Sequence, residues 1–158
     1  MLDSLMMRAG VMFLVIGMVW GIEMGIRQDF SMAPAHAHFN LVGGVLLFVF
    51  GLYYRMVPAA RDSMLAKWQS GLHILGAILF PVGVAVVIKK GESFIVLPIV
   101  GSLIVATAVA LFVIFGKRWA LLPGLVMEAI PGMGVFPWWV LVVVSIVLYD
   151  GIKKPLKS

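Results

Sequence analysis

The sequence contains no cysteine and few charged residues, and both shortages narrow the class of protein. Without cysteine the chain has no disulfide, no iron–sulfur cluster and no thiolate metal site. Charged residues make up 12% and hydrophobic residues 63% of the 158 residues. Soluble domains are about half apolar and about a quarter charged. The composition therefore predicts an integral membrane protein.

The excess of basic residues has an explanation within the membrane. The net charge is +5, but lysines and arginines lie at the ends of apolar runs, where positive-inside sorting and anionic headgroups account for them. We expect the lipid bilayer as a partner and no nucleic acid. The first apolar run is long enough to span and lacks a small-residue cleavage site, so no cleavable signal peptide is predicted.

Apolar runs of about 20 residues, the length of a membrane-spanning helix, recur along the chain. They predict spans at about 5–26, 35–57, 66–88 and 94–116, with a weaker fifth span at 137–149. Residues 119–136 carry Pro123, Pro131 and Gly132, and we expect this stretch to be irregular, interfacial or re-entrant. The predicted fold class is an all-α bundle of four to five transmembrane helices in one domain, residues 1–158.

The orientation is predicted from the basic loops. With five spans, lysine and arginine divide equally between the two sides, and with four they favour a cytoplasmic N-terminus. The short basic loop from Arg55 to Lys67 supports the same choice. We expect a bacterial inner membrane protein with a cytoplasmic N-terminus and with His36 and His38 near the outer surface.

Two histidines at the start of the second predicted span are the leading site candidates, because polar groups in a membrane are often functional. Residues two apart on a helix point about 200° from each other, so His36 and His38 cannot chelate one ion together. His36 and Asn40 are four apart and share a face. The geometry suits two separate sites, or one site and one structural histidine.

A neutral imidazole in an apolar span can be an axial ligand of haem iron, or it can be a packed, hydrogen-bonded residue. His73 is expected to lie about 15 Å deeper in the membrane than His38, from the rise of 1.5 Å per residue along a helix. It is therefore a poor partner for His36 or His38 on one iron, and we expect it to be structural.

Further residues lie near the predicted depth of the histidine pair. Met24 and Met32, with Glu23, would suit a copper site of mixed soft and imidazole ligands. Gly21 and Gly25, which with Gly17 form a stripe of small residues, would suit close helix packing or space for a flat ligand.

Two successive segments resemble part of a known family. "AHAHFNLVGGVLLFVFGLYYRMVPA" and "KWQSGLHILGAILFPVG" resemble two helices of the catalytic subunit of haem-copper oxygen reductases, over about 50 of the 158 residues. The shared features are a His-x-His pair that opens a helix, a Tyr-Tyr and Pro-containing turn, and a histidine in the next helix. In this chain they are His36, His38, Tyr53, Tyr54, Pro58, Lys67, Trp68 and His73.

The resemblance implies that His36 and His38 ligate haem iron in different pockets. It does not extend to oxygen-reductase chemistry, since the family needs three further histidines for copper and another for the low-spin haem, and this chain has only three in total. The family's catalytic subunit is built from three four-helix arcs, so a four-span chain would resemble one of these arcs. Three copies of the chain would then resemble the whole subunit, and we expect a trimer rather than a dimer.

The leading hypothesis is a small haem b membrane protein, metal-binding through His36, His38 or both, with Asn40, Met24, Gly21 and Gly25 nearby. It would serve electron transport, redox or gas sensing, or haem handling. The alternatives are a structural or assembly protein without a cofactor and a copper-binding protein that uses Glu23. Whether it is an enzyme, and what its redox partner is, stay open.

Overall fold

The computed structural model describes residues 1–115, and all regular structure within them is helical. The elements are α1 (Leu2–Arg27), α2 (Ala33–His38), the π-helix η1 (Phe39–Leu46), α3 (Leu47–Met56), α4 (Pro58–Arg61), α5 (Met64–Lys90), the 3₁₀ turn η2 (Glu92–Phe94) and α6 (Val96–Phe115). Residue contacts divide the chain into two units, Met1–Ala110 and Leu111–Ser158.

Four helical stretches are long and apolar enough to cross a membrane, which confirms an all-α membrane bundle. They are Leu2–Arg27, Ala33–Met56, Met64–Lys90 and Glu92–Val113. The second is continuous through α2, η1 and α3. The predicted fifth span at 137–149 and the predicted irregular stretch at 119–136 lie outside the described residues.

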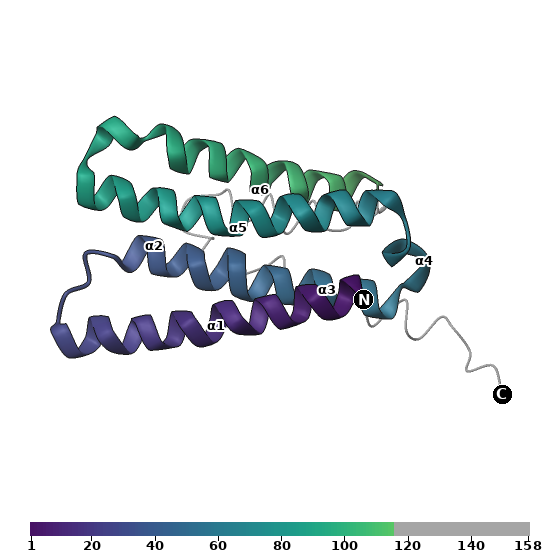
Figure 1. Cartoon of the computed structure of the whole chain (residues 1–158), viewed down its shortest axis with the longest axis horizontal. Helices are drawn as coiled ribbons and strands as arrows, with labels where there is room; N and C mark the ends of the chain where they lie inside the picture. Colours follow the sequence, from purple (N-terminus) through teal and green to yellow (C-terminus); the bar gives the residue numbers. More distant parts are fainter. Residues whose placement is uncertain (116–158) are drawn as a thin grey trace, which may run out of the picture. The chain divides into compact units, whose positions relative to one another are not determined.

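The helices run up and down, each beside the next (Figure 1). Along the second span, α1 packs against η1 and α3, while α2 and η1 also contact α5. The pairing of α5 with α6 is close because Gly83 lies against the main chain of Pro98 and Gly101 against that of Phe80. Small residues of this kind let helix backbones approach in a lipid environment.

Local signals set the ends of the helices. Gln28 ends α1 in the left-handed conformation, with φ 50°, and Pro34 lies in the first turn of α2, where a missing N–H is tolerated. The Ser63 hydroxyl accepts a hydrogen bond from the Ala66 N–H at 3.1 Å and caps the start of α5. The turn after α1 therefore brings the histidine pair back into the bundle at the end where α5 also terminates, called here the histidine end.

Candidate functional site

His36 faces α1 and is held there by three neighbours. Its ring makes an edge contact with Trp20, with centroids 5.8 Å apart, and Cε1 lies 3.1 Å from where a Cβ on Gly21 would be. The Asn40 Nδ2 lies 3.1 Å from the ring Nε2 and 3.3 Å from Nδ1. It also donates to the His36 main-chain oxygen at 3.2 Å. His36 is therefore both packed and hydrogen-bonded.

His38 faces the opposite way, towards α5. Its ring lies against the Phe80 ring, with centroids 4.3 Å apart and planes tilted by 37°. The side chain is half-buried, and it forms no hydrogen bond with any residue between 1 and 115. The two histidines thus lie on opposite sides of one helix, as the two-residue spacing predicted.

His73 is fully buried and bonded to a neighbouring helix. Its Nε2 lies 3.0 Å from the Val42 carbonyl, and its ring makes an edge contact with Phe50, centroids 5.1 Å apart. His38 instead packs on Phe80, about two helical turns further along α5, or roughly 11 Å. This separation is somewhat less than expected from the sequence, and His73 still lies too deep to share an iron with His38.

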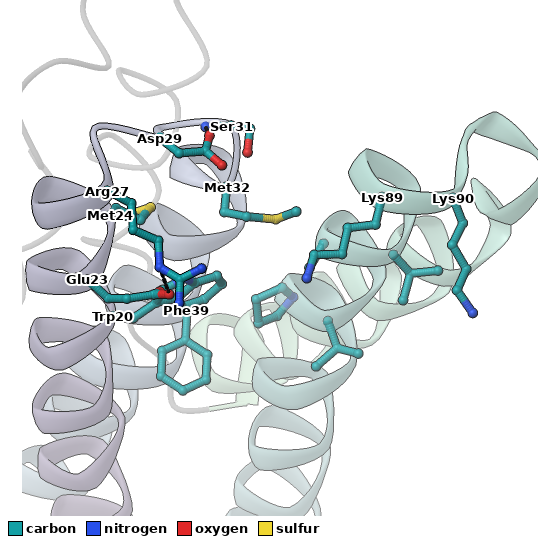
Figure 2. Close-up of a pocket in the computed structure, with 14 residues that line it drawn as sticks. Trp20, Glu23, Met24, Arg27, Asp29, Ser31, Met32, Phe39, Lys89 and Lys90 are labelled. Atoms are coloured by element: carbon teal, nitrogen blue, oxygen red, sulfur yellow. Dashed lines mark hydrogen bonds and ion pairs between the residues drawn. The ribbon is translucent and has the colours of Figure 1, made fainter.

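The methionine and glutamate residues considered as metal ligands line a cavity and do not surround one of the histidines. Glu23, Met24 and Met32 line a cavity of about 410 Å³ at the histidine end, and neither His36 nor His38 is part of its lining (Figure 2). The Glu23 carboxylate pairs with Arg27 at 2.8 Å. In the described part of the chain, no three residues among histidine, cysteine, aspartate and glutamate gather as metal ligands. Glu23, Met24 and Met32 thus lie together on this cavity, while His36 and His38 lie outside its lining.

The glycine stripe of α1 serves mainly to pack the second span. Gly17 lies against the Asn40 amide and Gly21 against the His36 ring, whereas a Cβ on Gly25 would meet nothing within 4 Å. About two turns before Gly17, a Cβ on Gly10 would lie 2.8 Å from main-chain atoms of Gly44 and Phe48. Of the glycines considered as ligand space, only Gly25 borders an open region.

Two features of the site were not apparent from the sequence. The first is the π-helix η1, which contains Val42, the acceptor for His73. The pair Gly43–Gly44 was its only signal, since glycine pairs mark helix irregularities. The second is a buried polar group below the histidines: Tyr54 donates to Gln69 Oε1 at 3.0 Å, and the adjacent Ser70 donates to the Met6 sulfur at 2.9 Å.

The comparisons with protein families, with curated proteins and with solved structures found no match to this chain.

Proposed function

We propose that the chain is a small haem b membrane protein in which His38 ligates the iron. One observation carries the proposal: His38 is the histidine whose ring nitrogens have no hydrogen-bond partner among residues 1–115, whereas His36 is engaged by Asn40 and His73 by Val42. A half-buried imidazole near the end of an apolar span, with a free nitrogen, has the donor chemistry of an axial haem ligand.

The residues around His38 fit that role. The Phe80 ring packs against one side of the imidazole, with centroids 4.3 Å apart, and limits the orientations that the imidazole can take. The apolar span around it favours the neutral imidazole that metal ligation requires. A bound haem would supply an iron that changes oxidation state and binds small gases. Electron transfer, redox or gas sensing, and haem handling are the roles that such a group allows.

His36 fits less well as a ligand in the described arrangement. Asn40 lies within hydrogen-bond distance of both ring nitrogens, and α1 closes the space beside the ring at Trp20 and Gly21. Ligation by His36 would require the ring to leave these contacts. We therefore assign His36 to fixing the start of the second span against α1, which places His38 on the other side.

A second chain would complete a six-coordinate site. Within residues 1–115, His36 lies near the depth of His38 but faces α1, and His73 lies deeper, so neither is placed to be a second ligand. Closed symmetric assemblies repeat each residue at its own height, so a second chain would bring another His38 to the same depth. A homo-oligomer, with a trimer favoured over a dimer, is therefore part of the proposal. The argument for an oligomer is the number of available ligands. Gly17 and Gly21 do not support it, because they already pack against Asn40 and His36 of the same chain. A bacterial inner membrane and a cytoplasmic N-terminus complete it.

The test is the absorption spectrum of the purified protein with single substitutions. A Soret band and a sharp α-band on reduction are expected. His38→Gln should abolish both, while His36→Gln and His73→Gln should keep them. Each variant needs an unchanged helical circular dichroism signal as a control for folding. Unchanged haem content in the double variant His36→Gln/His38→Gln would refute the proposal.

A structural or assembly protein without a cofactor is the second candidate. It is favoured by the fact that two of the three histidines already have packing and hydrogen-bonding roles. A colourless preparation that remains without a Soret band after incubation with haemin would support it.

A further inference from the structure

The cavity at the histidine end has an apolar wall and a charged rim. It lies between the last turns of α1 and α5 and the turn after α1 (Figure 2). Its apolar lining comprises Trp20, Phe39, Pro81, Val82, Ala85 and Val86. Because α1 ends at Arg27 and α5 at Lys90, the rim stands where a span gives way to the headgroup region.

The acidic groups on the rim are already engaged by the chain itself. Glu23 pairs with Arg27 at 2.8 Å, across one turn of α1. The Asp29 carboxylate accepts a hydrogen bond from the Ser31 N–H at 3.0 Å, and this bond holds the pKa of Asp29 below its usual range. Glu23 is thus neutralised by Arg27, whereas Asp29 stays an anion on the rim, with its carboxylate turned towards the Ser31 N–H.

Lys89 is a basic residue of the rim whose side chain has no acidic partner among residues 1–115. Figure 2 shows its amine directed into the cavity, towards the side where Met32 and Phe39 lie. It takes part in no ion pair formed among residues 1–115. The neighbouring Lys90 is directed away and lies over the Phe94 ring, with Nζ 5.8 Å from the centroid. The cavity therefore combines a lysine that has no ion-pair partner among residues 1–115 with an apolar wall.

We propose that this cavity binds a membrane lipid with an anionic headgroup, whose phosphate pairs with Lys89 while an acyl chain lies along Pro81, Val82 and Ala85. The wall alone would not select a lipid, since acyl chains meet equally apolar surface elsewhere in a bilayer. Selection comes from charge, and a basic residue near the membrane surface is worth about a fivefold preference for an anionic lipid. The site does not depend on haem.

The test is native mass spectrometry of the full-length, delipidated protein titrated with phosphatidylglycerol or phosphatidylcholine carrying the same acyl chains. Wild type should bind the first phosphatidylglycerol about fivefold more tightly. Lys89→Gln should remove this preference and Lys89→Arg should keep it. Lys67→Gln is the matched control, because Lys67 is an exposed cation in the first turn of α5, at the opposite end of the helix.

Two further measurements separate the cavity from general surface charge. Ala85→Phe fills the wall and should weaken binding of the first lipid of either kind. Excess inorganic phosphate should not displace phosphatidylglycerol, because a free anion lacks the acyl chain. Equal affinity of wild type for the two lipids, a preference that survives Lys89→Gln, equal losses in Lys89→Gln and Lys67→Gln, or displacement by phosphate would each overturn the proposal.

Discussion

The imidazole Nε2 of His73 lies 3.0 Å from the main-chain carbonyl of Val42, which belongs to the π-helix η1. A carbonyl can only accept, so Nε2 carries the proton and donates it to Val42, while the buried Nδ1 has no hydrogen-bond partner among residues 1–115. The bond joins α5 to the second span at the place where that span departs from α-helical geometry. His73 therefore links α5 to the second span, which fits the structural role expected from the sequence.

Replacement of His73 tests this structural role. His73→Gln should lower the free energy of unfolding by about 1–2 kcal/mol, since it disturbs a buried hydrogen bond. It should leave any haem spectrum unchanged. Thermal unfolding followed by circular dichroism in one detergent measures the first effect and absorption the second. Loss of the haem bands with full retention of stability would show that His73 is a ligand.

Close packing of the first two spans predicts a contrast between two glycines of α1. Gly10→Ala would place a methyl group 2.8 Å from main-chain atoms of Gly44 and Phe48, so the helices must separate. The expected loss of stability is about 1–3 kcal/mol. Gly25→Ala meets nothing within 4 Å and should be neutral or slightly stabilising. Equal thermal shifts for the two variants would contradict the observed packing.

The buried pair Tyr54–Gln69 should show energetic coupling. Tyr54→Phe removes the donor to Gln69 Oε1, and Gln69→Leu removes the acceptor. The double variant should be less destabilised than the sum of the single variants by roughly 0.5–1.5 kcal/mol. Chemical unfolding of the four proteins of the cycle measures this difference. Additive effects would mean that the hydrogen bond contributes nothing beyond its separate partners.

Asn40 offers a way to separate the two histidines of the pair. Asn40→Ala removes the amide beside the His36 ring and should cost roughly 1 kcal/mol of stability. If His38 is the ligand, the Soret band should keep its position and intensity. A shift or loss of the band in Asn40→Ala would assign the iron to His36 instead.

The spans could be predicted because spanning length and hydropathy are local properties. The first predicted span, 5–26, lies within the observed Leu2–Arg27. The opposed directions of His36 and His38 also followed from the rotation per residue alone, because α2 is α-helical where they stand. Asn40 lies on the same face as His36, as the four-residue spacing predicted, and the two are hydrogen-bonded.

The contacts that decide each histidine's role could not be predicted in this way. A π-helix depends on how Gly43 and Gly44 fit against Phe13 and Leu14 of α1, and hydropathy does not report that fit. The Glu23–Arg27 ion pair, by contrast, has the four-residue spacing of a local helical pair and could be predicted from the sequence. The cavity requires α1 and α5 to be placed together, and each helix alone gives no sign of it.

Most apolar side chains of α1 are exposed in the isolated chain, among them Val15, Val19 and Ile22. Lipid tails solvate such surface as well as another helix would, so the hydrophobic effect inserts these helices but does not hold them to one another. The helices are instead held to one another by close packing at the glycines and by a few buried hydrogen bonds. The choice of detergent should therefore affect helix packing within the chain as strongly as a mutation does. A detergent that enters between the helices at these glycines would remove many of the contacts that join them.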